Sequence, residues 1–326
     1  MVIMKRLSIF FVCTLLTVVF MHNTLAAKPI KIGLIGLDTS HAPAFTKILN
    51  DSTYEHHIPG GRVVAAFSGG SPDVEASITR VQRFTDQVAG YGIKIVPTIE
   101  ELATHIDAVI LTSVDGRVHL EQAKPVIAAG KAVFIDKPMA ASLADVKTIF
   151  ELADEAGVPC FSASSLRFFP ELQQVLVDTA LGRVIGCDAY SPAALEPHHP
   201  DLMWYGVHGV EILFTAMGSE CISLSRTFTQ GTDLVTGLWT DGRIGTFRGT
   251  RKGKGHYGAT IFFEKGVRNV EPGSGNLYVP LLQEILQFFR TGESPIPQEE
   301  TIAMFAFMEA ADESKERDGA RVQLKY

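Results

Sequence analysis

The chain has 326 residues, of which 46% are hydrophobic and 20% are charged, and it carries a formal net charge of −7 at pH 7. This is the composition of a globular protein, and the length suffices for two domains with cores of their own. The negative net charge argues against a nucleic acid as the main partner. The one local basic cluster, RKGKGHYG at 251–258, is interpreted as a solvated hairpin loop.

The first residues have the pattern of a secretory signal. Lys5 and Arg6 precede the apolar run LSIFFVCTLLTVVFM at 7–21, and small residues including Ala26 follow it. The run is shorter than the roughly 20 residues that span a bilayer comfortably. We therefore expect residues 1–26 to be a cleaved Sec-type signal peptide, and the mature protein to be exported, periplasmic or extracytoplasmic, with no stable membrane span. A retained N-terminal anchor is the alternative.

Residues 28–162 alternate apolar strands with helices. Strands are predicted at 30–37, 62–67, 92–98, 107–114, 131–138 and 159–165, and helices at 41–50, 73–89, 99–106, 120–130 and 143–156. Ser40 and Ser142 stand where they are expected to cap the helices that follow them. This alternation predicts a Rossmann-type, doubly wound parallel sheet in a first domain at 27–165.

The pattern changes at about residue 166. Four segments between 221 and 266 are strand-like and partly alternating, and Asp241-Gly242 between two of them is a hairpin signal. One helix is predicted before them, at 206–218, and two after them. The sequence therefore predicts a second, α+β domain at 166–326 with a largely antiparallel sheet and helices on one face. The three cysteines beyond the signal segment, Cys160, Cys187 and Cys221, are an odd, widely spaced set and are expected to be buried thiols.

The segment GLIGLDTSH at 33–41 stands where a dinucleotide fingerprint would stand. Gly36 fits the tight-turn position, but Asp38 and His41 occupy the positions of the second and third glycines. A helix N-terminus with free amides still favours a phosphate there, and the hydroxyls of Thr39 and Ser40 add donors. The second predicted strand ends in FSGGSP, beginning at Ser68, without the carboxylate that usually holds the ribose in NAD enzymes. The choice between NAD and NADP stays open.

Two long stretches give the chain a family resemblance. The segment from DAVILTSVDGRVHLEQAKP to SASSLRFFP, at 107–170, and the tail from PLLQEILQFF to DGARV, at 280–322, resemble the Gfo/Idh/MocA oxidoreductases, named after glucose–fructose oxidoreductase, inositol dehydrogenase and the rhizopine protein. The chain is most similar to a branch that carries GLDTSH and DKP. The resemblance implies NAD or NADP bound in the first domain, a substrate site on the C-terminal sheet, and a homo-oligomer that pairs through that sheet.

The resemblance also assigns site residues. The family's Glu-Lys-Pro motif is Asp136-Lys137-Pro138 here, so Lys137 is the counterpart of the lysine near the nicotinamide and the reacting hydroxyl. His208 in WYGVHGVE corresponds to the histidine of the C-terminal domain. Two departures accompany it, because Trp204 replaces an aspartate four residues earlier and Glu211 replaces an aspartate three residues later.

Hydride transfer from an alcohol requires a base for the hydroxyl proton, and imidazole suits that role. We expect His208 to act as the base and Lys137 to polarise the oxygen, with Tyr205 on the same helical face as a hydrogen-bonding partner of the substrate. These three are the predicted catalytic residues. The predicted cofactor-binding residues are Gly36, Thr39, Ser40, Ser68, Ser113, His119, Asp136, Lys137 and Arg167, and the predicted substrate-binding residues are His198, His199, Asp201 and Trp204.

Together these features predict an exported NAD(P)-dependent oxidoreductase that acts on a sugar or cyclitol hydroxyl. Since free nicotinamide cofactors are scarce outside the cytoplasm, such an enzyme is expected to hold its cofactor tightly. The alternative is a non-redox or catalytically silent carbohydrate-binding relative, with a metal on the His-rich segment 198–208. Asp38 and Trp204 favour that alternative, whereas Lys137 and His208 favour the enzyme.

Overall fold

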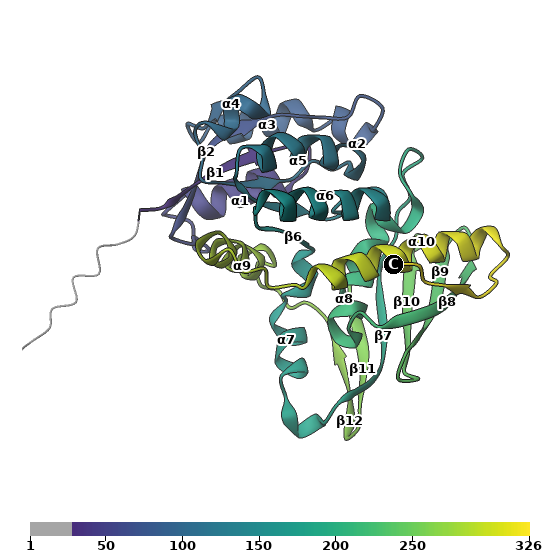
Figure 1. The fold of residues 1–326 in the computed structure, drawn as a ribbon. Helices are drawn as coiled ribbons and strands as arrows, with labels where there is room; N and C mark the ends of the chain where they lie inside the picture. Colours follow the sequence, from purple (N-terminus) through teal and green to yellow (C-terminus); the bar gives the residue numbers. More distant parts are fainter. Residues whose placement is uncertain (1–27) are drawn as a thin grey trace, which may run out of the picture.

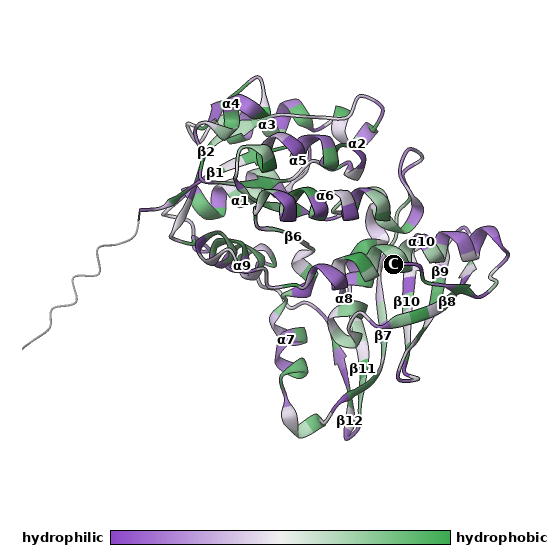
Figure 2. Cartoon of the chain, viewed as in Figure 1, coloured by the Kyte–Doolittle hydropathy of each residue, from purple (hydrophilic) through white to green (hydrophobic). Residues whose placement is uncertain are grey.

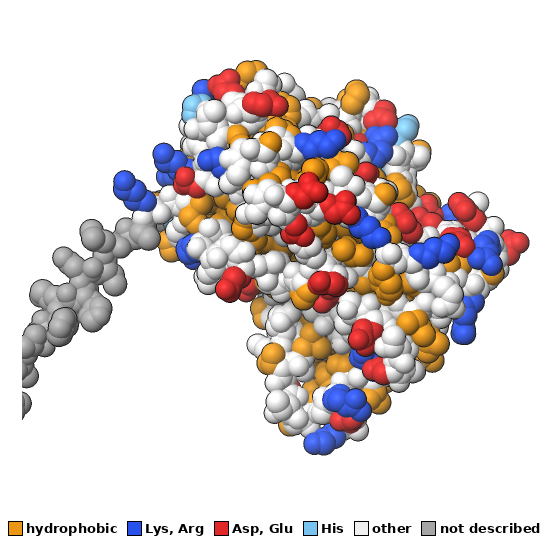
Figure 3. Space-filling view, viewed as in Figure 1, with side chains coloured by type: hydrophobic (Ala, Val, Ile, Leu, Met, Phe, Trp, Pro, Cys, Tyr) orange, Lys and Arg blue, Asp and Glu red, His pale blue; other side chains and the backbone are white. Residues whose placement is uncertain are grey.

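The computed structural model describes residues 28–326, so the predicted signal segment at 1–26 lies outside the described residues. Figure 1 shows two sheets with their helices, joined along one side. None of the helices between residues 28 and 326 is long and apolar enough to cross a membrane. Acidic and basic side chains are interspersed over the face seen in Figure 3, and no single sign dominates it.

The first sheet is parallel and six-stranded, in the order β3-β2-β1-β4-β5-β6. Its strands are β1 Ile30–Ile35, β2 Gly61–Phe67, β3 Lys94–Ile95, β4 Ala108–Leu111, β5 Ala132–Asp136 and β6 Cys160–Ala163. The predicted fold class is confirmed, because this is the strand order of doubly wound dinucleotide-binding domains. All four residues of β4 and of β6 are buried, as expected for strands covered on both faces.

Helices cover both faces of this sheet. They are α1 His41–Asn50, α2 Glu75–Ile78, α3 Val81–Ala89, α4 Ile99–Ala103, α5 His119–Ala128 and α6 Leu143–Ala156, with a short 3₁₀ turn η1 at Gly116–Val118. The prediction of one continuous helix over 73–89 was wrong, since the helix is interrupted between α2 and α3. Ser77 accounts for this locally: its hydroxyl oxygen accepts from the amide of Ser71, and this bond ties α2 to the loop after β2.

Two predicted helix caps have different outcomes. Ser142 accepts a hydrogen bond from the amide of Asp145 and caps α6 as expected. Ser40 makes no such bond, because its own backbone is already helical, with φ −65° and ψ −13°, whereas a capping residue needs an extended backbone. The amide of His41 donates to the hydroxyl of Thr39 instead, at 2.9 Å.

The second sheet has seven strands in the order β12-β11-β7-β10-β9-β8-β13. They are β7 Val184–Pro192, β8 Cys221–Phe228, β9 Thr232–Trp239, β10 Ile244–Thr250, β11 Gly258–Phe263, β12 Gly266–Val270 and β13 Val322–Gln323. The pairs are antiparallel except for β10 with β7, so the predicted largely antiparallel sheet is confirmed. The loop at 251–258 is not a hairpin, because β10 and β11 lie on either side of β7 rather than side by side.

The helical segments of the second half are α7 Pro170–Leu176, α8 Val207–Met217, α9 Tyr278–Thr291 and α10 Gln298–Glu316, with 3₁₀ turns η2 Ser165–Arg167 and η3 Thr179–Leu181 and a π-helical turn η4 Leu202–Gly206. α8 packs on β7 and β10, and α10 packs on β8, so both helices cover the same sheet. Figure 2 shows that α8 is predominantly hydrophobic, which follows from its burial between the sheet and its helical neighbours.

α9 leaves the second sheet and packs on the first domain, as Figure 1 shows. Its buried residues Leu281, Ile285 and Phe288 belong to the hydrophobic cluster of β1 and α1, and the ring of Phe288 lies 4.6 Å from that of Phe161 in β6. A sequence boundary at 165 therefore separates the two sheets but does not separate the two hydrophobic cores.

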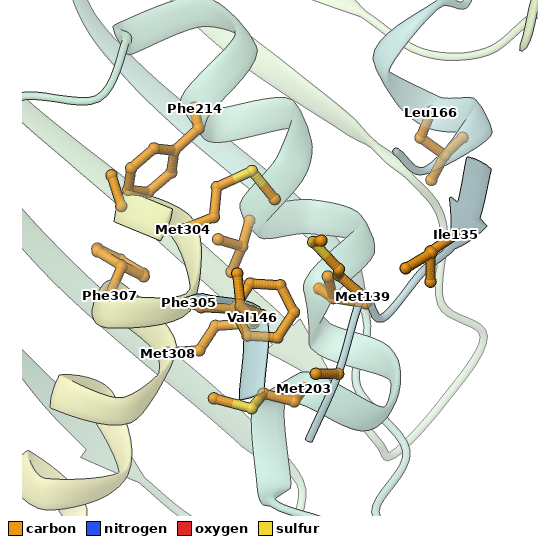
Figure 4. Packing of buried hydrophobic residues seen from close by; sticks show 14 of the residues in the cluster. Ile135, Met139, Val146, Leu166, Met203, Phe214, Met304, Phe305, Phe307 and Met308 are labelled. Carbon is orange, nitrogen blue, oxygen red and sulfur yellow. The ribbon is translucent and has the colours of Figure 1, made fainter. Parts of the chain in front are cut away.

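A second cluster runs from one domain into the other. Figure 4 shows Val146 of α6 beside Phe305 and Met308 of α10, with Met139 and Met203 close by. The three cysteines beyond the signal segment are buried and unpaired in the described part of the chain, as expected. The apolar contact between α6 and α10 is continuous, so the two domains share part of one hydrophobic core.

Candidate active site

A cavity of about 1020 Å³ lies where the carboxyl ends of the parallel strands face the second domain. This is the position at which open α/β sheets bind ligands. The first domain contributes the start of α1, the α2–α3 segment and the end of β5. The second domain contributes η4, α8 and the residues before α9. The residues that carry the chemistry are Thr39, Ser40, His41, Arg80, Arg83, Asp136, Lys137, Glu196, Trp204, Tyr205, His208, Tyr257 and Tyr278.

The three predicted catalytic residues meet in this cavity. Lys137 directly follows β5, and its Nζ atom lies 5.6 Å from the ring centre of Tyr205. Tyr205 stands on the π-helical turn, and its ring lies 5.1 Å from that of His208 at the start of α8. The hydroxyls of Tyr205 and Tyr257 are 2.9 Å apart. A cation, an imidazole and a phenol from both domains therefore share one wall.

The two nitrogen groups at this wall are biased towards their neutral forms. Burial lowers the pKa of Lys137, and the nearby Asp136 offsets this only in part. Burial also lowers the pKa of His208 well below its usual value, and the charges of Lys137 and His41 act in the same direction. A lysine with a lowered pKa loses its proton more readily than a free lysine and can then act as an acceptor, and a neutral imidazole can donate one hydrogen bond and accept another.

Ser164, in the loop after β6, sets the orientation of the His208 ring. Its hydroxyl lies 2.7 Å from Nδ1 of His208 and accepts the amide hydrogen of Leu166 at 3.1 Å. The hydroxyl hydrogen of Ser164 is then free to donate to Nδ1. With that donation, the imidazole proton would be on Nε2, which would then be a hydrogen-bond donor.

Asp136 offers an unsatisfied acceptor at the cavity. Its Oδ2 atom lies 2.5 Å from Nδ1 of His41, whose ring packs edge-on against Tyr278. Its Oδ1 atom is buried and has no hydrogen-bond partner within the described structure. A buried carboxylate oxygen without a partner is costly, so it favours a ligand that brings a hydroxyl or amide donor.

The turn between β1 and α1 is closed by Asp38. This carboxylate is fully buried, accepts from the amide of Val114 at 2.9 Å and from the hydroxyl of Ser77 at 2.7 Å, and has a pKa raised by burial. The amide of Leu37 donates to the carbonyl of Ser68 at 2.7 Å. The Asp38 carboxylate is therefore engaged within the protein, and so are the amides of Gly36 and Leu37.

Four of the predicted cofactor-binding residues line the cavity, namely Thr39, Ser40, Asp136 and Lys137. The other five are placed elsewhere. Gly36 adopts φ 84° in the closed turn, and the Ser68 hydroxyl accepts from Thr85. The side chain of Ser113 bonds Gln122, the ring of His119 is fully buried between two carbonyls, and Arg167 pairs with Glu211 and Glu300. These five support the walls rather than form their surface.

Among the predicted substrate-binding residues, only Trp204 lines the cavity. His198 is exposed and contacts Glu196, whereas His199 is buried against Trp204, with a pKa that burial lowers to about 4. Asp201 belongs to an ion-pair cluster with Arg226 and Lys315. No group of three metal-ligating side chains gathers within residues 28–326, so the structure does not assemble the alternative metal site at 198–208.

The sequence analysis assigned no site role to six of these cavity residues, namely His41, Arg80, Arg83, Glu196, Tyr257 and Tyr278. The arginines lie in a segment that was interpreted only as helix, although their spacing of three residues places them on one side. Tyr257 ends the basic loop that was taken as a solvated hairpin. Tyr278 begins α9, and only the return of that helix to the first domain brings it to the cavity.

The residues present fit a dinucleotide, with one change from the usual arrangement. The cavity is large, Asp136 offers a free acceptor for a ribose or substrate hydroxyl, and Lys137 stands at the end of β5. The turn after β1, however, has no free glycine-rich surface, because Asp38 occupies it. Side chains around Thr39 and Ser40 would have to hold the phosphates.

The fold and this cavity define a two-domain protein with a Rossmann-type domain whose ligand site is completed by an antiparallel sheet. Residues 30–164 match the model of an oxidoreductase family with an NAD-binding Rossmann fold, Gfo/Idh/MocA. The match covers the first domain and agrees with the resemblance noted from the sequence.

One named relative is similar to this chain in sequence, and solved structures are similar to it in fold. The 1,5-anhydro-D-fructose reductase of Ensifer adhaerens is 30% identical over 145 residues, which cover 43% of this chain and 40% of the reductase. The alignment therefore spans less than half of that relative. The structure of myo-inositol dehydrogenase from Lactobacillus casei with NAD(H) and myo-inositol has a TM-score of 0.71 at 17% identity, covering 91% of this chain and 97% of the dehydrogenase. The scyllo-inositol dehydrogenase of the same organism, with NAD(H) and scyllo-inositol, has a TM-score of 0.70 at 17% identity, covering 91% and 99%.

Proposed function

We propose that this protein is an NAD(P)-dependent oxidoreductase that acts on a CH–OH group of a sugar or cyclitol. The observation that carries the proposal is the meeting of Lys137, Tyr205 and His208 in one cavity beside the unpartnered Oδ1 atom of Asp136. The family of the first domain and the activities named for its relatives support the same class of reaction.

The hydrogen bonds favour a division of roles opposite to the one expected from the sequence. His208 keeps its proton on Nε2 because Ser164 donates to Nδ1, so it serves as a donor to the substrate oxygen rather than as the base. Lys137, whose pKa burial lowers, accepts the hydroxyl proton. When bound, the nicotinamide would accept the hydride from the carbon that carries this hydroxyl. The alcohol thereby loses one proton and one hydride and becomes a carbonyl.

The walls of the cavity suit a polyhydroxylated ring. Trp204, Tyr205 and Tyr257 present aromatic surface, against which the C–H face of a sugar packs. Glu196 and Asp136 present carboxylate oxygens that accept from ring hydroxyls. This combination favours a neutral polyol over a charged or fully apolar substrate.

The test combines cofactor analysis with a substrate panel. The purified protein is denatured and the supernatant is analysed for NAD(H) and NADP(H), after which the protein is assayed with both cofactors against inositols, hexoses and anhydro sugars. We expect either retained or added dinucleotide to bind, and reduced nicotinamide to form with at least one polyol. Empty protein that binds neither cofactor would reject the redox function and leave carbohydrate binding as the remaining reading.

We further propose that the protein works outside the cytoplasm and retains its cofactor there. The basis is the signal-like segment before residue 27. Mass analysis of the N-terminus of the protein from its native cells tests this: an N-terminus near Ala27 supports export, and an intact Met1 argues against signal cleavage.

A second copy of the chain is the proposed partner of the open face of the second sheet. Ile244 points away from α8 on that face with 55% exposure, and the partly exposed Leu238 pairs with it across the strands. Light scattering of the wild type and of an Ile244→Asp variant tests the pairing, with a smaller particle expected for the variant.

A further inference from the structure

Two arginines form part of the cavity wall opposite the catalytic residues. Arg80 is the residue just before α3, and Arg83 lies in the first turn of that helix. Both line the cavity together with Thr39 and Ser40. Among the described residues neither guanidinium forms an ion pair, in contrast to Arg117 and other arginines of the same chain, which bind carboxylates. These two cations face the cavity with their charge uncompensated by a direct partner.

Contacts beneath α3 hold this pair in place. The guanidinium of Arg83 lies 4.6 Å from the ring centre of Phe84, which is buried in the core of the first domain. The preceding helix α2 is tied to the β1–α1 turn through the bond from Ser77 to Asp38. The arginines are therefore carried by a segment that is anchored to the same turn that a diphosphate would normally approach.

In this protein, other groups would have to take over the phosphate-binding role that the β1–α1 turn usually has. The amides of Gly36 and Leu37 donate to the carbonyls of Phe67 and Ser68, and the His41 amide donates to the Thr39 hydroxyl. The turn therefore leaves fewer backbone donors for a diphosphate than a glycine-rich turn does. Cationic side chains on the cavity wall could supply the missing contacts.

We propose that Arg80 and Arg83, together with the hydroxyls of Thr39 and Ser40, form the phosphate anchor of the bound dinucleotide in place of the glycine-rich turn. A guanidinium presents its N–H groups as a planar fork that matches two phosphate oxygens. The inference rests on the proposed function, since it names the residues that hold that function's cofactor. Glu75 is the acidic neighbour on this wall and is exposed, so it is free to turn towards the solvent.

The test measures binding directly. Isothermal titration with NAD⁺, NADP⁺ and inorganic pyrophosphate is performed on the wild type, on Arg80→Ala, on Arg83→Ala and on the double variant, at low and at physiological salt. Arg62→Ala is the matched control, because Arg62 is an exposed arginine near the start of β2, at the opposite end of the sheet from the cavity. Loss of charge-assisted hydrogen bonds predicts at least about a tenfold weaker affinity in the double variant.

Each outcome has a defined meaning. Weaker binding of both cofactors in the double variant, with the control unchanged, supports the anchor and places the diphosphate there. A loss confined to NADP⁺ overturns the diphosphate anchor, because it assigns the arginines to the 2′-phosphate alone. Unchanged affinity for both cofactors overturns the anchor while the redox function stands. If the wild type binds pyrophosphate through these arginines but binds no dinucleotide, the anion site stands and the redox function falls. Binding of none of the three overturns both.

Discussion

Ser164 and His208 come from different domains, and their side chains share a hydrogen bond of 2.7 Å at the base of the cavity. Ser164 follows the last strand of the parallel sheet, and His208 begins the helix that covers the antiparallel sheet. Both groups are buried, so the bond is shielded from water. The orientation of the imidazole ring is thus coupled to a residue of the other domain.

Replacing Ser164 with Ala is expected to free both tautomers of His208 and to lower kcat roughly tenfold, by loss of an oriented hydrogen bond. The nitrogen-15 shifts of the His208 ring provide the direct readout, with Nε2 protonated in the wild type and a mixture in the variant. Ser164→Thr, which keeps the hydroxyl, should restore the wild-type spectrum. A wild-type ring protonated on Nδ1 would contradict the assigned role of His208 as donor.

Lys137→Met keeps the length of the side chain and removes the amine. We expect kcat for polyol oxidation to fall by about 10²-fold or more, because a proton acceptor is lost, while cofactor affinity changes little. Steady-state kinetics and cofactor titration separate these effects. Lys265→Met, on an exposed strand end of the second domain, is the control. Retention of full activity in the Lys137 variant would exclude its role as the base.

His199 predicts a dependence of stability on pH. Burial lowers the pKa of His199 to about 4, below the ordinary value of 6.5, so the unfolded state binds the proton more readily than the folded state. The free energy of unfolding is therefore highest above pH 6.5 and decreases as the pH falls towards 4. The full loss amounts to about 3 kcal/mol. Urea unfolding of His199→Gln should show a shallower decline of unfolding free energy over that range. The exposed neighbour His198 provides the comparison, and an equal decline in wild type and His199→Gln would refute the prediction.

Asp38 is expected to stabilise the first domain rather than to contact a ligand. Asp38→Ala leaves the Val114 amide and the Ser77 hydroxyl buried without their partner, which should lower the unfolding free energy by about 2–4 kcal/mol. Asp38→Asn, which retains one acceptor oxygen, should cost less. Thermal and urea denaturation measure this, with the exposed Asp86→Ala as control. A variant as stable as that control would show that the network contributes little.

Much of the fold was predictable because it depends on local periodicity. A few consecutive residues suffice to predict each of three features: the buried strand at 30–35, the capped helix after Ser142 and the strands after residue 221. The break between α2 and α3 was not predictable, since it depends on the contact of Ser77 with residues distant in the sequence. The same holds for β7, whose position between β10 and β11 is decided by the sheet as a whole.

The position of the candidate site was partly predictable, and the full set of residues that line it was less so. Lys137, Tyr205 and His208 carry motifs, and the structure brings them together. His119 and Arg167 also belong to motifs, but their side chains bind other groups of the protein and do not line the cavity. These internal contacts cannot be predicted from the spacing of residues in the sequence. Arg80, Arg83 and Tyr278 belong to no motif, because their relation to the cavity arises only from the packing of α3 and α9.

The return of α9 to the first domain has a practical consequence for dissecting this protein. A fragment that stops near residue 165 would contain every strand of the parallel sheet, yet it would expose the apolar patch that Leu281, Ile285 and Phe288 normally shield. Such a truncation should aggregate when expressed by itself, and supplying the missing helix as a fused or added peptide should rescue its solubility.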